Sequence, residues 1–133
     1  MKPQKIISEL KQSLQTEVKF ALVYGSILTK YFKKDSDIDL GVYLGKKPDL
    51  DTYIDLKQRI EQHFDYQFEI DPVIFDNADP IIAMQILANG ELIIKHDLEP
   101  FIKYKARMIS QYLDFKMDRK RIEERIAEGS VYA

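Results

Sequence analysis

The sequence predicts one mixed α/β domain of the α+β class, with a small mixed sheet flanked by helices and a long helix at its C-terminal end. Two observations predict this class. Stretches with apolar residues at helical spacing alternate with short apolar or alternating runs that are typical of strands. The chain has 133 residues, which is long enough for one hydrophobic core and short for two. We expect the core over about residues 3–95 and the long helix over about 99–128.

The first part of the chain predicts one helix and two strands. Residues 3–16 should form a helix that begins at Pro3, because their apolar residues recur every three or four positions. The run VKFALVY at 18–24 is almost entirely apolar, which is typical of a central buried strand. A short helix or loop over 26–34 and a turn should follow. Residues 37–44 alternate between apolar and other side chains, which predicts a second strand.

The middle of the chain predicts a second helix and a third strand. Apolar residues lie along one side of a helix from about 49 to 64. The segment FEIDPVIF at 68–75 should be a strand. Pro72 interrupts it and has no N–H to donate to a ladder, so we expect an edge strand or a bulge.

Capping signals bound the next helix. Asp79 followed by Pro80 predicts a helix start, with the helix over residues 81–88. We expect Asn89-Gly90 to end this helix in a left-handed conformation. The run ELII at 91–94 should be a last short strand.

The C-terminal helix is expected to run from about residue 99 to 128, with Gly129 as its stop. Its apolar stripe is formed by Phe101, Tyr104, Met108, Tyr112, Phe115, Ile122 and Ile126. At about 1.5 Å per residue the helix would reach roughly 40 Å, which is longer than a small domain needs. Core packing explains the proximal half. For the distal half, a solvated surface and a partner interface remain alternatives.

The composition excludes several classes of protein. With 45% hydrophobic and 32% charged residues, the chain is typical of a globular protein. A formal net charge of −2 gives no general attraction to nucleic acid. The absence of cysteine excludes disulfides and thiolate metal sites. No apolar run approaches the ~18 residues that would span a bilayer, and the charged N-terminus lacks the apolar core of a signal peptide, so we expect a cytoplasmic protein.

Two carboxylates, Asp37 and Asp39, stand two positions apart at the start of the second expected strand. Residues two apart on a strand point to the same side of the sheet. Two carboxylates this close repel each other and favour a cation between them. Mg²⁺ prefers oxygen ligands and is usually shared between carboxylates and substrate phosphates. The pair therefore predicts a Mg²⁺ site.

Gly25-Ser26 and Asp71 supply the other parts of a nucleotide site. Gly25 and Ser26 end the first expected strand, and a glycine lets backbone N–H groups approach a phosphate while the serine adds a hydroxyl donor at a helix N-terminus. Asp71 is an acid in an apolar run. On a strand beside Asp39 it would complete a two-metal cluster and act as general base for an attacking hydroxyl. The alternative for Asp71 is a solvated acid at a sheet edge.

The spacing of Gly25-Ser26 and Asp37-x-Asp39 is similar to the signature of the DNA-polymerase-β-like nucleotidyltransferases. The segments SDIDLGVYL, FEIDPVIF and ANGELI resemble the minimal nucleotidyltransferases (MNT) of that superfamily, over roughly residues 18–95. The resemblance implies a polymerase-β-like fold in which Gly25 and Ser26 hold the triphosphate. Asp37 and Asp39 would bind Mg²⁺, and Asp71 would complete the triad.

The same resemblance implies a function. Minimal nucleotidyltransferases are commonly the antitoxins of toxin–antitoxin modules, and their partner is a HEPN-domain ribonuclease toxin. Members of the antitoxin type transfer AMP from ATP to a tyrosine of that toxin. Two alternatives are an antitoxin that neutralises its partner by binding alone, and a small-molecule nucleotidyltransferase resembling those that modify aminoglycosides.

The sequence departs from the family after Ser26. Many members have an arginine directly after Gly-Ser and a further glycine a few residues later, whereas here Ile27 and Thr29-Lys30 occupy those places. Lysines of the segment KYFKKDSD are candidates to replace the missing charge, and the alternative is an ordinary solvated loop. His63 and His96 lie outside every motif and are expected to be surface or helix-end residues.

Overall fold

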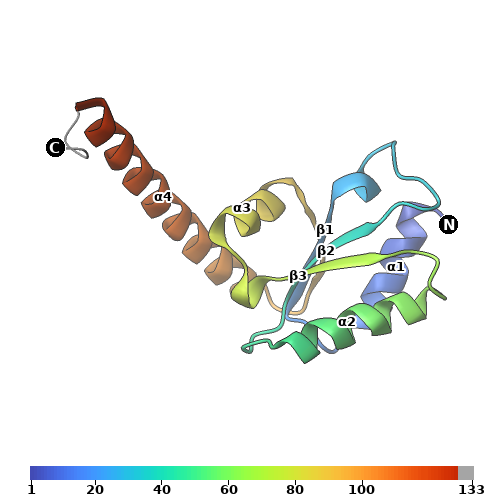
Figure 1. The fold of residues 1–133 in the computed structure, drawn as a ribbon. Helices are drawn as coiled ribbons and strands as arrows, with labels where there is room; N and C mark the ends of the chain where they lie inside the picture. Colours follow the sequence, from blue (N-terminus) through green and yellow to red (C-terminus); the bar gives the residue numbers. More distant parts are fainter. Residues whose placement is uncertain (129–133) are drawn as a thin grey trace.

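A computed structural model of the chain describes residues 1–128. Its elements are α1 (Pro3–Leu14), β1 (Phe20–Tyr24), the 3-10 helix η1 (Gly25–Leu28), β2 (Ile38–Tyr43), α2 (Leu50–His63), β3 (Ile70–Ile74), the 3-10 helix η2 (Phe75–Asn77), α3 (Pro80–Asn89), β4 (Glu91–Lys95) and α4 (Leu98–Glu128). The four strands form one sheet, with α1 and α2 on one side and α3 on the other, and α4 projects away from the body (Figure 1). The mixed α/β architecture predicted from the sequence is confirmed.

The sheet has the strand order β3-β2-β1-β4. Strand β1 pairs antiparallel with both β2 and β4, whereas β2 and β3 are parallel, so the sheet is mixed. The expected central position of β1 is confirmed. Strand β3 lies at an edge, which explains how the sheet accommodates Pro72.

The outer edge of β3 is closed to further strands. Ile38 donates its N–H to the carbonyl of Glu69 at 2.9 Å, so the backbone of Glu69 faces β2. Backbone groups of successive strand residues point to opposite sides, so those of the next residue, Ile70, point away from β2. Glu61 Oε2 accepts the N–H of Ile70 at 3.1 Å, and Lys57 Nζ donates to the carbonyl of Ile70 at 2.6 Å. Pro72 faces the same way and has no N–H. Side-chain capping and a proline therefore block edge-to-edge pairing.

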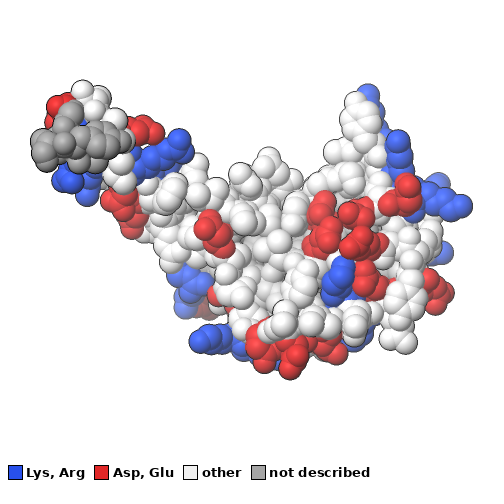
Figure 2. Space-filling model, in the orientation of Figure 1, with Lys and Arg blue, Asp and Glu red and all other residues white. Residues whose placement is uncertain are grey.

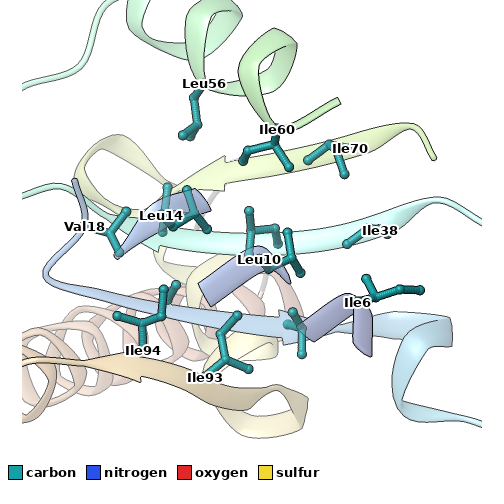
Figure 3. Packing of buried hydrophobic residues seen from close by; sticks show 14 of the residues in the cluster. Ile6, Leu10, Leu14, Val18, Ile38, Leu56, Ile60, Ile70, Ile93 and Ile94 are labelled. Carbon is teal, nitrogen blue, oxygen red and sulfur yellow. The ribbon is translucent and has the colours of Figure 1, made fainter. Parts of the chain in front are cut away.

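Two hydrophobic clusters hold the helices to the sheet. The first lies between the sheet and the pair α1–α2, and it contains Ile6, Leu10, Leu14, Leu56 and Ile60 among others (Figure 3). The α1 residues recur at the helical spacing that predicted this helix. In α2, Leu50 and Ile54 from the expected apolar side are 71% and 40% exposed, and Leu56 is buried in their place. The second cluster lies on the opposite face, and it contains Phe20, Leu22, Phe75, Ala83, Ile86, Leu87, Tyr104 and Met108. The predicted start of α3 is also confirmed, because the Asp79 side chain accepts the N–H of Ile81 at 2.8 Å.

The predicted left-handed stop at Asn89-Gly90 is wrong. Asn89 is the last residue of α3, and Gly90 is extended with φ −84° and ψ 166°. A glycine is needed there for another reason. A Cβ on Gly90 would lie 2.7 Å from the carbonyl oxygen of Ile86 and 3.0 Å from that of Val23. The backbone of the α3–β4 connection thus passes too close to α3 and β1 for any side chain.

Several predicted boundaries also shift. Helix α1 ends at Leu14 rather than residue 16, and β1 begins at Phe20 rather than residue 18. Val18 is nevertheless buried, because it packs into the first cluster from the connection before the strand. The predicted stop at Gly129 lies outside the described residues. No helix within residues 1–128 is long and apolar enough to cross a membrane.

Candidate active site

Side chains from three neighbouring strands form a row across one end of the sheet. Asp39 of β2 and Asp71 of β3 are direct partners in the parallel register, and Tyr24 at the end of β1 is the partner of Asp39. Directly paired residues point to the same face of a sheet. Asp37 precedes β2 by one residue and is exposed, and it stands two positions from Asp39. The structure therefore brings the predicted carboxylates together at one place.

The electrostatics of this row show an excess of negative charge. Partial burial raises the pKa of Asp39, and the charges of Asp71 and Asp37 raise it further. Burial together with Asp39 and Asp71 raises the pKa of Tyr24 to about 12. Figure 2 shows acidic side chains gathered on this face of the molecule, over β2 and β3. An excess of carboxylate charge in a partly buried place suits a cation.

The donor set fits Mg²⁺, although no complete cage is present. Within residues 1–128, no three His, Cys, Asp or Glu side chains are arranged to hold one metal ion between them. Mg²⁺ usually keeps several waters and takes only one or two carboxylates, with substrate phosphates supplying the remaining oxygens. Asp37 and Asp39 offer such oxygen ligands. Their assignment as metal ligands, and that of Asp71 as the third member, remains a prediction.

Gly25 adjoins Asp39 in space. Its φ is +79°, a backbone conformation that residues other than glycine rarely adopt. A Cβ on Gly25 would lie 2.2 Å from Asp39 Oδ2. The glycine therefore permits both the turn after β1 and the position of the Asp39 carboxylate. The sequence suggested only the approach of a phosphate as the reason for this residue, and that role remains a prediction.

The helix expected after Gly25 is a single turn. The 3-10 helix η1 has four residues, and Ser26 is its second. The carbonyl of Ser26 accepts the N–H of Thr29 at 2.9 Å and its hydroxyl at 2.8 Å. One turn is too short to build the dipole of an α-helix. Any phosphate contact here would depend on individual N–H groups and on the Ser26 hydroxyl.

Other predicted residues lie apart from this row. Lys30 sits over the ring of Tyr31 at 5.4 Å, and Phe32 anchors the loop by stacking on Phe68 at 6.0 Å. The role of the loop lysines in replacing the missing charge remains a prediction. His63 pairs with Glu9 at 2.7 Å, and His96 contacts the carbonyl of Gln15. Both histidines are exposed, as predicted.

Two features were missed by reasoning from the sequence. Tyr24 joins the site because it is paired with Asp39, and only its position directly before Gly25 signalled this. A mainly apolar pocket of about 500 Å³ lies between the N-terminal ends of α2 and α3. Its lining includes Tyr53, Val73 and Ile82. Val73 shares a face of β3 with Asp71, two residues away, although Asp71 itself does not line the pocket.

Removing the charge of Asp39 is expected to stabilise the protein when no divalent cation is present. The raised pKa means that the ionised carboxylate destabilises the folded state at neutral pH, and that this cost disappears as the pH falls through the raised pKa. Asp39→Asn should therefore melt at a higher temperature than the wild type at pH 7 in chelator. The difference should shrink on acidification.

Thermal melts with and without Mg²⁺ check this. Added Mg²⁺ should raise the Tm of the wild type and leave that of Asp39→Asn unchanged. Asp114→Asn, on the exposed distal part of α4, is the matched control and should behave like the wild type. A lower Tm for Asp39→Asn in chelator would contradict the electrostatic account.

Comparisons with known proteins identify the family of the chain. The family described as "Polymerase beta, Nucleotidyltransferase" matches residues 4–99. No curated protein sequence matches the chain.

Solved structures share the fold over nearly the whole chain. The structure of the tri-AMPylated Shewanella oneidensis HEPN toxin in complex with MNT antitoxin matches with a TM-score of 0.73 at 19% identity, covering 94% of this chain and 98% of that one. A toxin–antitoxin structure with AMP-PNP gives 0.72 at 20% identity, covering 96% and 99%. The toxin–antitoxin MntA-HepT gives 0.66 at 17%, covering 95% and 97%.

Proposed function

Because the chain belongs to the polymerase beta nucleotidyltransferase family, we propose that it is a Mg²⁺-dependent protein adenylyltransferase that acts as an antitoxin. In this proposal it transfers AMP from ATP to a tyrosine hydroxyl of a cognate HEPN-domain ribonuclease toxin. The observation that carries the proposal is the direct pairing of Asp39 with Asp71, with Gly25 against the Asp39 carboxylate. The acceptor class is supported by the tri-AMPylated HEPN toxin in one structurally similar complex.

Each group of the site has a role in this reaction. Asp37 and Asp39 would hold Mg²⁺, which supplies neutralisation of the triphosphate charge when it is bound. The N–H groups around Gly25 and the Ser26 hydroxyl would orient the phosphates. Asp71 would accept the proton of the acceptor hydroxyl as its oxygen attacks the α-phosphorus. The new bond joins that oxygen to the α-phosphorus, the bond to the β-phosphate oxygen breaks, and pyrophosphate leaves.

Positioning would account for most of the catalysis. Asp39 and Asp71 are fixed on adjacent paired strands, so their separation does not depend on a flexible loop. Groups held in this way need little reorganisation during the reaction.

Intact-mass spectrometry of the HEPN partner tests the proposal. After incubation with this protein, ATP and Mg²⁺, the partner should gain one or more AMP units. Excess chelator should abolish the gain. A partner that binds this protein and keeps its mass in Mg²⁺ and ATP would overturn the proposed activity.

A second candidate, an antitoxin that acts by binding alone, is favoured by one observation. Ile27 occupies the place where many family members have an arginine, and it is only 4% exposed. It packs in the hydrophobic core and offers no charge to a phosphate. Complementation separates the two candidates. Rescue of cells from the toxin by Asp37→Asn/Asp39→Asn would support binding alone, whereas loss of rescue with an intact complex would support catalysis.

A further inference from the structure

The distal half of α4 carries an apolar face that the rest of the described residues, 1–128, leaves largely exposed. Tyr104 and Met108 are 2% and 5% exposed, because they pack into the cluster beneath α3. The same face continues through Phe115 and Ile122, at spacings of four or seven residues. These two side chains are 47% and 55% exposed. Figure 1 shows this half of α4 extending beyond the rest of the molecule.

The part of this face that contains Phe115, though not Ile122, forms one wall of a groove with α3. The groove encloses about 450 Å³ and is lined by Ile81, Tyr112, Phe115, Lys116, Arg119, Lys120 and Glu123. Ile81 lies on α3 and the remaining residues lie on α4. A concave apolar site with aromatic side chains is the kind of place where binding energy concentrates. It therefore differs from a scattered set of exposed apolar residues.

The groove is connected to the candidate active site through α3. Ile81 lines the groove, and its neighbour Ile82 lines the apolar pocket that also contains Val73, on the same strand as Asp71. Helices α3 and α4 pack on the sheet face that also carries the row of carboxylates. Phe20, Leu22 and Tyr24 stand two positions apart on β1, so all three side chains point to that face. Figure 2 shows largely uncharged surface between the acidic cluster and α4. A ligand seated in the groove would thus extend along one side of the molecule towards the carboxylates.

The charge of the groove indicates what it binds. Lys116, Arg119 and Lys120 contribute three positive charges and Glu123 one negative, which leaves a net charge of +2. Lys116 lies over the Tyr112 ring at 5.2 Å, and Arg119 contacts Glu123 at 3.1 Å. A second copy of this chain placed symmetrically would bring the same positive residues against each other. A partner with an acidic surface is favoured instead.

We propose that the groove between α3 and the distal half of α4 docks the protein acceptor, through an amphipathic helix that carries acidic residues. This inference rests on the proposed function, since it takes the HEPN-domain protein to be the partner. Apolar residues of the docked helix would fill the space between Ile81 and Phe115. Its acidic residues would face Lys116 and Lys120. The docking surface would place the acceptor on the side of the sheet where the half-buried Asp39 and Asp71 lie.

A matched pair of single variants tests the docking surface. Phe115→Asp changes an apolar residue that lines the groove. Met117→Asp changes an apolar residue outside that lining, about 200° away around the helix. The two side chains are 47% and 55% exposed, so both variants should keep the helical circular dichroism of the wild type. Affinity for the purified HEPN-domain protein is measured by titration without ATP.

The groove variant is expected to bind about 30-fold more weakly or worse, as for interface aromatic anchors. The control variant should keep the affinity of the wild type. Lys116→Glu/Lys120→Glu should also weaken binding, mainly through a slower association rate that depends on salt. Binding of Mg²⁺ and ATP should be unchanged in all three variants.

Three outcomes would overturn the proposal. Equal losses of affinity in the groove and control variants would show that the partner does not bind the groove specifically. Unchanged binding in the groove variant would place the interface elsewhere. If the wild-type protein alone is a dimer and the groove variant is a monomer, the occupant of the groove is a second copy of this chain.

A partner that binds through the groove but gains no AMP would overturn the proposed activity and leave the docking surface intact.

Discussion

Replacing Asp37 and Asp39 together by alanine is expected to lower the rate of AMP transfer by roughly a thousandfold or more. The pair supplies the oxygen ligands for Mg²⁺, whose charge neutralisation at the phosphates contributes several kcal/mol to the reaction. Each 1.4 kcal/mol corresponds to about a factor of ten in rate. The measurement is the rate of AMP incorporation into the HEPN partner, followed by intact mass under single-turnover conditions.

Asp35→Ala is the matched control for this variant. Asp35 is an exposed carboxylate two positions before Asp37, and it belongs to the same loop. It should retain the wild-type rate. Both proteins should still bind the partner, because the proposed docking surface lies on α3 and α4. A double variant that transfers AMP at the wild-type rate would exclude the assigned metal ligands.

Tyr104→Ala is expected to lower the free energy of unfolding by about 3–5 kcal/mol, as for other large buried aromatic residues. The Tyr104 ring is 2% exposed and lies 5.2 Å from the rings of both Tyr43 and Phe75. Its hydroxyl donates to the carbonyl of Phe75 at 2.8 Å. The side chain therefore joins α4 to the sheet and to η2, and its loss would leave a cavity at that junction.

Urea unfolding of a small series separates the two contributions of Tyr104. Tyr104→Phe keeps the ring and removes one of the two donors to the Phe75 carbonyl, which still accepts the N–H of Ala78 at 3.3 Å, so it should cost about 0.5–1.5 kcal/mol. Tyr31→Ala removes a tyrosine that is 69% exposed and should stay within about 0.5 kcal/mol of the wild type. A Tyr104→Ala variant as stable as Tyr31→Ala would refute the packing argument.

Much of the fold was predictable because it depends on local periodicity. Ile6, Leu10 and Leu14 recur every four residues, and the structure buries all three. The alternation after Asp37 identified β2 for the same reason, since side chains on a strand change face at every residue. The errors fall at the ends of elements. Gly90 was assigned a left-handed conformation from its type alone, whereas the proximity of Val23 and Ile86 decides its role.

The candidate site was predictable only in part. The sequence identified Asp37, Asp39 and Asp71 as carboxylates on strands, from their spacing and from their apolar neighbours. It gave no indication that Asp76 binds the turn after β2, where its carboxylate accepts the N–H groups of Leu44 and Gly45 at 2.8 Å each. Such contacts join residues about thirty positions apart, and no short pattern records them.

The sequence by itself determined the types of the elements, the positions of the acidic residues and the family resemblance, because periodicity and motif spacing are properties of adjacent residues. Only the tertiary structure decided that Asp71 pairs with Asp39, that Gly25 makes room for the Asp39 carboxylate and that α3 borders a groove on α4. The physical reason is that strand order, register and helix packing are set by how separate segments bury their apolar faces together. That choice is made by the whole chain.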